Sequence, residues 1–122
     1  MSTPLHQIKA EFFKTLSHPL RIRVLELLSE REYSVGELLA ELEVEASNLS
    51  QQLAVLRRAG LVSTRKEGST VHYSLVSPRI AELMTVARSI LTTVLSERVE
   101  ALTTLQSDAQ SSRRSQLRRG SR

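Results

Sequence analysis

The sequence predicts one mainly helical domain that carries a single small β-hairpin. Apolar residues make up 40% of the 122 residues and aromatic residues only 3%. Leu, Val, Ile and Ala recur along most of the chain at the three- and four-residue spacing of amphipathic helices. Between residues 62 and 75 the apolar period changes to two, which is typical of strands. The chain is long enough for one domain with a core and too short for two that each fold alone.

The three prolines mark helix starts, because proline is favoured at the first helical position, where its missing N–H costs nothing. Each follows a residue that can precede a helix: Thr3-Pro4, His18-Pro19 and Ser77-Pro78. Serine and threonine are good N-caps and histidine is a poor one, so Ser17 is expected to share the capping role of His18. We therefore expect two helices that begin near residues 4 and 19, and a long one from residue 78.

Two short helices are predicted between residues 34 and 60. Ser34 and Glu37 form a capping box, in which each side chain accepts a hydrogen bond from the backbone N–H of the other residue. After a tight turn at residues 43–45, a helix over residues 46–59 ends before Gly60, which suits the left-handed position that follows a helix. Three leucines give this helix its buried face: Leu49, Leu53 and Leu56. Two short helices joined by such a turn form a helix-turn-helix.

A basic hairpin follows the helix-turn-helix. Its strands alternate through Val62, Thr64 and Lys66 and then through Val71, Tyr73 and Leu75, and residues 67–69 can turn between them. This hairpin is the wing of a winged helix-turn-helix, with four helices before it and one after it.

The last helix carries more apolar surface than one small domain can cover. Its pattern runs from residue 78 to residue 105, or roughly 42 Å at about 1.5 Å per residue. Five side chains form a stripe that the monomer cannot fully bury: Leu83, Ile90, Leu91, Val94 and Leu95. Because excess apolar helix usually indicates a partner, we expect a homodimer held chiefly by this helix.

Charge is segregated along the chain. Residues 26–45 hold seven Glu and one Arg, which are expected mainly to keep the protein soluble, whereas residues 46–79 hold five Lys or Arg and one Glu. A basic face opposite an acidic one suits a protein that docks one side on a polyanion. Residues 106–122 hold five Arg and little apolar surface, so we expect a disordered basic tail beyond a domain of residues 1–105.

Several classes of protein are disfavoured by what the sequence lacks. There is no cysteine, which excludes disulfides, thiolate metal sites and thiol switches. No apolar run approaches the roughly 20 residues of a membrane span, and residues 1–10 lack the apolar core of a signal peptide, so a cytoplasmic protein without a membrane partner is expected. Glu97 and Glu100 are the one pair that resembles acid–base carboxylates, and a solvated helix face explains them better. No enzyme is predicted.

The helix over residues 46–59 presents a polar face opposite its leucines. That face is uncharged at its N-terminal end and cationic at its C-terminal end: Ser47, Asn48, Ser50, Gln51, Arg57 and Arg58. In the major groove of double-stranded DNA, Asn and Gln can make paired hydrogen bonds to adenine, while Ser and Arg can bind phosphates. The alternative is an ordinary solvated face.

Three stretches in one order resemble the ArsR/SmtB family of bacterial winged-helix repressors. They read LSHPLRIRVL at residues 16–25, SNLSQQLAVLRRAGLV at residues 47–62 and RKEGSTVHYSL at residues 65–75. The resemblance covers residues 12–99 and implies a homodimeric repressor that binds an imperfect palindrome and blocks polymerase. The runner-up is a winged-helix module that binds a protein partner rather than a specific operator.

The resemblance also implies which residues meet DNA and which meet the second subunit. It adds five residues, four of them in the wing, to the helix face at the DNA: Gln52, Arg65, Lys66, Ser69 and Thr70. Gln52 stands where many members have His, so its role stays open. The interface is expected to combine the first and last helices: Leu5, Ile8, Phe12, Leu83, Ala87, Ile90, Leu91, Val94 and Leu95.

No metal site and no cofactor are predicted, and the inducing signal stays unknown. Relatives bind metals through cysteines at the start of the third helix or through Asp and His on the last helix. Here the matching positions read Ser34, Val35 and Gly36, and then Ser77, Arg79, Ile90 and Thr93. None of these is a credible soft-metal set. His6 with carboxylates such as Glu97 or Glu100 across a dimer is the alternative left open.

Overall fold

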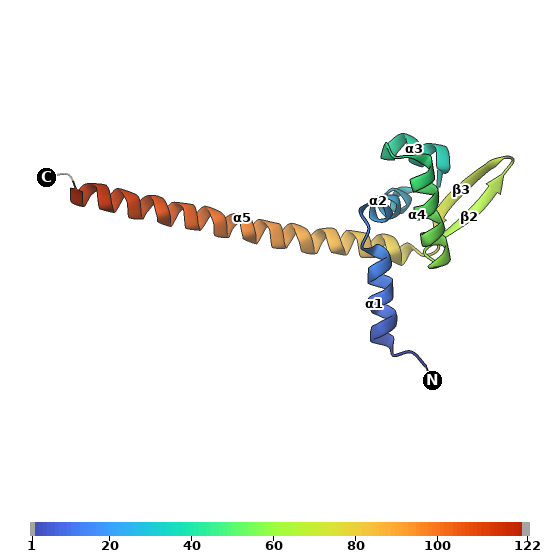
Figure 1. Cartoon of the computed structure of the whole chain (residues 1–122), viewed down its shortest axis with the longest axis horizontal. Helices are drawn as coiled ribbons and strands as arrows, with labels where there is room; N and C mark the ends of the chain where they lie inside the picture. Colours follow the sequence, from blue (N-terminus) through green and yellow to red (C-terminus); the bar gives the residue numbers. More distant parts are fainter. Residues whose placement is uncertain (1, 121–122) are drawn as a thin grey trace. The chain divides into compact units, whose positions relative to one another are not determined.

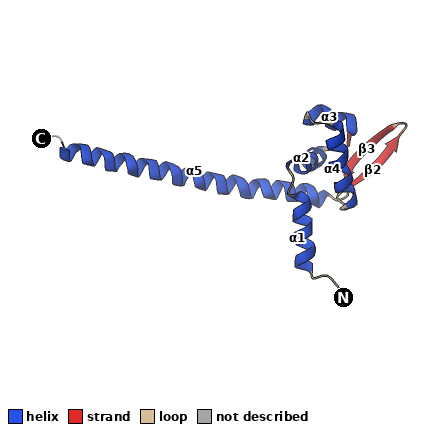
Figure 2. Ribbon diagram, in the orientation of Figure 1, coloured by secondary structure: helices blue, strands red, loops and turns tan. Residues whose placement is uncertain are grey.

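A computed structural model describes residues 2–120, which contain the five helices and two strands in the expected order and one further strand. Figure 1 follows the chain and Figure 2 separates helix from strand. The elements are α1 Leu5–Leu16, α2 Pro19–Glu30, β1 Tyr33–Ser34, α3 Val35–Leu42, α4 Ala46–Arg58, β2 Val62–Glu67, β3 Thr70–Leu75 and α5 Pro78–Gly120. The prediction of a winged helix-turn-helix is confirmed. Within residues 2–120, no helix combines the length and apolar character of a membrane span.

The core of the first compact unit, Met1–Thr85, lies between α2, α3 and α4. Its fully buried side chains come from these three helices: Val24, Leu25, Leu38, Leu49, Leu53 and Leu56. In Figure 1 the three helices gather at one end of the β2–β3 hairpin. The helix spacing of the sequence identified the core-facing side of α4 correctly, whereas on α2 the expected Ile22 is exposed and Leu27 is buried instead.

The helix ends follow from local hydrogen bonding. The capping box is present, with the Glu37 N–H donating to Ser34 Oγ at 3.2 Å and the Ser34 N–H donating to Glu37 Oε1 at 2.9 Å. At the end of α4, Gly60 is left-handed with φ of 76°. There the Gly60 N–H donates to the Arg57 carbonyl and the Leu61 N–H to the Leu56 carbonyl, both at 3.0 Å. This pair of bonds is a Schellman motif, which satisfies carbonyls that the helix itself leaves open.

The prediction that Ser17 shares the capping of α2 is wrong. His18 caps the helix, because its Nδ1 accepts the Leu20 N–H at 3.2 Å. Ser17 instead donates from its Oγ to the Lys14 carbonyl at 2.7 Å, which closes the end of α1. A neutral imidazole nitrogen is an acceptor, so histidine can take the place of a hydroxyl here. The first helix also begins one residue later than expected, at Leu5.

The sheet has three strands in the order β1-β3-β2, and β1 was not predicted. This two-residue strand pairs Tyr33 with Tyr73, and it is too short to show an alternating pattern in the sequence. The predicted wing hairpin is present, with Val62 opposite Leu75 and Glu67 opposite Thr70, so its turn is shorter than the expected residues 67–69. Gly68 opens its two-residue turn with φ of 61°.

Helix α5 corrects the prediction of a disordered tail, because residues 106–120 continue the helix. No proline or glycine interrupts the chain between Pro78 and Gly120, so nothing local ends it. The second compact unit is Val86–Arg122, so the structure divides the chain earlier than residue 105. Two tail positions, residues 121 and 122, lie outside the described residues.

Gly60 and Gly36 allow a matched test of backbone conformation. An added Cβ at Gly60 would meet nothing within 4 Å, so Gly60→Ala should lower the free energy of unfolding by about 1 kcal/mol through left-handed strain alone. Gly36 lies inside α3, where Gly36→Ala should raise it by up to about 1 kcal/mol. Urea unfolding at one protein concentration measures both. Equal effects of the same sign would contradict the Schellman assignment.

Candidate nucleic-acid interface

The buried leucines of α4 set which of its residues reach solvent. Leu49 and Leu56 are completely buried and Leu53 nearly so, and they contact the core shared with α2. The opposite face is exposed, and it contains all six polar residues expected there: Ser47, Asn48, Ser50, Gln51, Arg57 and Arg58. The leucine spacing thus produces one exposed face along the helix, with polar residues at both ends and Ala54 between them.

This polar face has two chemically different ends. Hydroxyl and amide groups occupy the N-terminal turns, where no acidic residue is present, and Arg57 and Arg58 occupy the last turn. Amide groups recognise base edges, whereas guanidinium groups neutralise phosphates. The two arginines also lie at the helix end whose partial negative charge favours cations. The helix therefore carries base-reading groups at one end and phosphate-binding groups at the other.

Gln52 does not belong to the exposed face. It is 8% exposed, and its amide is engaged on both sides. Its Oε1 accepts from Arg21 Nε at 2.8 Å, and its Nε2 donates to Asn48 Oδ1 at 3.2 Å. Gln52 lies on the same buried side of α4 as the leucines. Its side chain is therefore not among the groups exposed for contact with DNA.

The wing presents exposed polar groups at its tip and on its first strand. Lys66, Ser69 and Thr70 are exposed, as expected for residues that approach a DNA backbone. Lys66 has no ion-pair partner within residues 2–120. Arg65 is different, because its guanidinium is held by Glu32 at 2.5 Å and by Glu67 at 3.0 Å. Arg65 therefore ties the wing to the chain segment before β1.

Glu32 has a structural role in the acidic segment of residues 26–45, which was expected mainly to keep the protein soluble. Its carboxylate accepts the Arg65 hydrogen bond, which lowers the pKa of Glu32 below its usual range. The same pairing raises the pKa of Arg65. His72 lies beside this pair, with Nδ1 3.8 Å from Glu32 and Nε2 3.6 Å from Glu67. Four charged or titratable groups thus meet at the wing.

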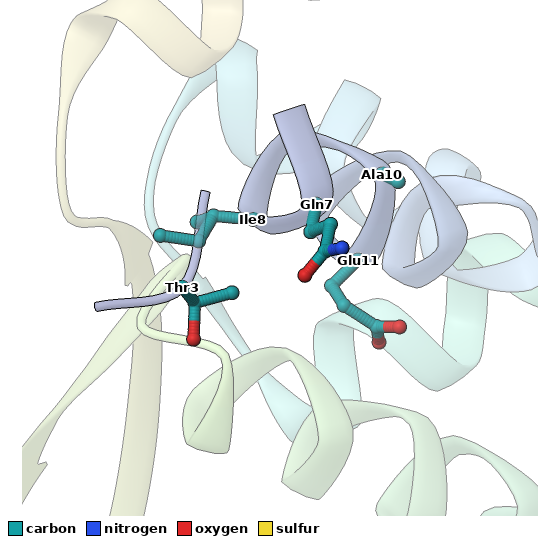
Figure 3. Close-up of a pocket in the computed structure, with 5 residues that line it drawn as sticks. All are labelled: Thr3, Gln7, Ile8, Ala10 and Glu11. Atoms are coloured by element: carbon teal, nitrogen blue, oxygen red, sulfur yellow. The ribbon is translucent and has the colours of Figure 1, made fainter. Parts of the chain in front are cut away.

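The predicted dimer residues include many exposed apolar side chains. On α1, Leu5 is 64% and Ile8 is 53% exposed, whereas Phe12 packs against the core. A hollow beside α1 is lined by Thr3, Gln7, Ile8, Ala10 and Glu11 (Figure 3). The hollow contains one carboxylate and no second acid or base, so it offers no catalytic pair.

The second unit has its own exposed apolar residues. Ile90, Leu91 and Leu95 are each more than half exposed. Ala87 and Val94, which belong to the same predicted stripe, are half-buried. Leu83, in the first unit, packs against the core. For the described part of the chain, no group of three His, Asp or Glu could hold a metal ion.

Two functional contacts were missed in the sequence. Arg21 and Glu32 each meet a residue more than 30 positions away along the chain. Arg21 lies within residues 16–25, a stretch that resembles the family, but that resemblance does not indicate which residue Arg21 contacts. Nothing in the sequence distinguishes Glu32 from its acidic neighbours.

Comparison with known proteins places these features in a family. Residues 18–64 match the model described as bacterial regulatory protein, arsR family. The HTH-type transcriptional regulator Rv0081 of Mycobacterium tuberculosis is 61% identical over 102 residues, which are 83% of this chain and 90% of that protein. Its crystal structure aligns with a TM-score of 0.75 at 62% identity and covers 80% of this chain and 99% of that one.

Two further solved structures are similar. The transcriptional repressor BigR from Xylella fastidiosa aligns with a TM-score of 0.66 at 39% identity, over 70% of this chain and 87% of that one. A homodimeric winged helix-turn-helix DNA-binding domain from Mycobacterium bovis, Mb0332, aligns with a TM-score of 0.69 at 25% identity, over 76% of this chain and 86% of that one. The M. tuberculosis and X. fastidiosa relatives are transcriptional regulators, a class without enzymatic activity, and the M. bovis relative is a DNA-binding domain.

The Glu32–Arg65 pair should make stability depend on pH. Because the pKa of Glu32 is lowered in the folded chain, its contribution is fully present above the ordinary value of 4.5 and is lost as pH falls through the folded value. The unfolding free energy of the parent should therefore exceed that of Glu32→Gln at pH 7, and the difference should vanish at low pH. Glu41→Gln is the control, because Glu41 has no ion-pair partner among the side chains of residues 2–118. A pH-independent difference for Glu32→Gln would contradict the pairing.

Proposed function

The chain belongs to the arsR family of bacterial regulatory proteins, and we propose that it is a homodimeric repressor that binds an imperfect palindromic operator through α4 and the β2–β3 wing. It is a DNA-binding transcriptional regulator. One observation carries the finer proposal: α4 buries its leucines and exposes Ser, Asn and Gln side chains in its N-terminal turns and two Arg side chains in its last turn.

In this proposal α4 enters the major groove with its N-terminal turns against the bases. Asn48 and Gln51 make hydrogen bonds to base edges there, because their amides carry both donors and acceptors. Ser47 and Ser50 bind neighbouring phosphates or bases, and Arg57 and Arg58 neutralise phosphates at the other end of the helix. Lys66, Ser69 and Thr70 on the wing contact the flanking backbone.

A homodimer explains why apolar side chains remain exposed on α1 and α5. The M. bovis relative is a homodimer, and two copies of this chain would cover the side chains of Leu5, Ile8, Ile90, Leu91 and Leu95. A two-fold symmetric protein reads a two-fold symmetric site, with half-sites about 34 Å apart along one turn of DNA.

Repression follows from occupancy, because a dimer bound across a promoter occupies the surface that polymerase needs. The X. fastidiosa relative is a repressor. Selection of bound sequences from a random DNA pool, followed by a transcription assay on the selected site, tests this. A symmetric consensus whose occupancy lowers transcription is expected, whereas a consensus whose occupancy raises transcription would make the protein an activator.

Gln51→Ala and Arg58→Ala should weaken DNA binding in different ways. Loss of the Gln51 amide should reduce discrimination at one base pair in each half-site by about 1–3 kcal/mol. Loss of the Arg58 charge should weaken all sequences alike and make log K less steep against log salt. Competition binding over a range of salt concentrations separates the two. Full parental preference at every position in Gln51→Ala would reject a base-reading role for Gln51.

Leu91→Glu should dissociate the dimer, because it places a charge in an apolar interface. Ser89→Glu is the matched control, since it adds the same charge to the opposite side of α5, roughly 160° around the helix from the centre of the stripe. Sedimentation equilibrium should show a monomer for the first variant and a dimer for the second. A tight dimer in Leu91→Glu would place the interface elsewhere.

A further inference from the structure

A chain of hydrogen bonds links the end of α1 to the exposed face of α4. Arg21 donates from Nη1 to the Thr15 carbonyl at 3.0 Å and from Nε to Gln52 Oε1 at 2.8 Å. Gln52 then donates from Nε2 to Asn48 Oδ1 at 3.2 Å. Among residues 2–118, Gln52 is the one buried polar or charged side chain. This series of hydrogen bonds ends at Asn48, whose side chain is exposed on the polar face.

The chemistry of these groups allows only one direction for the chain of bonds. A guanidinium has donors and no acceptor, so the Gln52 atom that meets Arg21 must be its oxygen. The amide nitrogen of Gln52 then faces Asn48, and the Asn48 atom that meets it must also be an oxygen. Asn48 is therefore left with its Nδ2 group, which carries two donors, directed away from Gln52.

We propose that Arg21 and Gln52 are positioning residues that hold Asn48 as a hydrogen-bond donor toward DNA. This inference rests on the proposed function of α4. An unrestrained Asn side chain can present either its oxygen or its nitrogen, whereas the held side chain presents its nitrogen. Guanine shows two acceptors and no donor in the major groove and thymine one acceptor and no donor, while adenine shows one of each and cytosine a donor. Asn48 accordingly selects a base without a donor in each half-site, with guanine preferred to thymine because guanine offers two acceptors to the two Nδ2 donors.

The same arrangement gives Arg21 a role at a distance from DNA. Its second bond, to the Thr15 carbonyl, joins the last turn of α1 to α2, and α2 lies beside α4 (Figure 1). Movement of the α1 end relative to α2 therefore acts on the orientation of one base-reading amide. Arg21 itself contacts no base in this scheme.

Gln52→Glu is the sharpest test, because it changes no heavy-atom shape and keeps the acceptor for Arg21. A carboxylate has no donor for Asn48, so the Asn48 amide must turn its nitrogen inward and its oxygen outward. Selection from a random DNA pool should then show the favoured base at one position changing from guanine to a base that carries a donor, adenine or cytosine, by about tenfold. The added negative charge weakens all sequences alike and leaves this ratio unaffected.

Three companion variants separate the possible outcomes. Asn48→Ala should abolish preference at the same position, and Arg21→Met should broaden it in the parent and have no effect in the Asn48→Ala background. Arg21→Lys, which keeps a donor, should restore part of the preference. Circular dichroism and the unfolding midpoint identify any variant that fails to fold. Gln52→Glu keeps the hydrogen bond from Arg21 to the Thr15 carbonyl.

The results distinguish this inference from the proposed function beneath it. If Asn48→Ala retains every parental preference, the base-reading role of the α4 face fails. If Asn48→Ala loses preference at one position while Gln52→Glu and Arg21→Met keep the parental base there, the positioning role is overturned and the α4 face stands. Slowed exchange of the Gln52 side-chain amide protons in the free protein, lost in Arg21→Met, is the expected independent sign of the bond.

Discussion

Burial of three leucines on α4 is the constraint on which the rest of the site depends. Turning a helix by one residue moves every side chain by about 100°, which would expose Leu49, Leu53 and Leu56. Burial of each leucine contributes about 1.5–3 kcal/mol, whereas an exposed ion pair such as Arg65–Glu67 contributes about 0–1 kcal/mol. The leucines therefore determine the rotation of α4 about its own axis, and this rotation leaves the residues on the opposite side exposed to solvent.

Polar contacts then refine what the apolar core has placed. Gln52 lies on the buried side of α4 but cannot be left without partners, because an unsatisfied buried amide costs about 1–3 kcal/mol. Arg21 and Asn48 satisfy it. At the wing, Glu32 holds Arg65. In both places a side chain predicted to meet DNA is also bonded within the protein, so the proposed DNA-binding surface is partly ordered in the free chain.

The sequence predicted features whose cause is local. The Ser34–Glu37 capping box, the left-handed Gly60 and the hairpin of the wing depend on residues within a few positions of one another, and all are confirmed. The predicted N-cap of α2 was wrong because His18, rather than Ser17, accepts the hydrogen bond from the Leu20 N–H. The helix predicted to end at residue 105 continues to Gly120, because no proline or glycine interrupts the segment despite its low apolar content.

The sequence by itself determined the order of the elements, the buried face of α4 and the polar character of its other face, because helix and strand periods are properties of neighbouring residues. The tertiary structure alone decided that β1 pairs with β3, that Arg21 meets Gln52 and that Glu32 meets Arg65. Each of these contacts joins residues at least 31 positions apart. No periodic pattern encodes such a pairing, since it exists only once the core has brought the elements together.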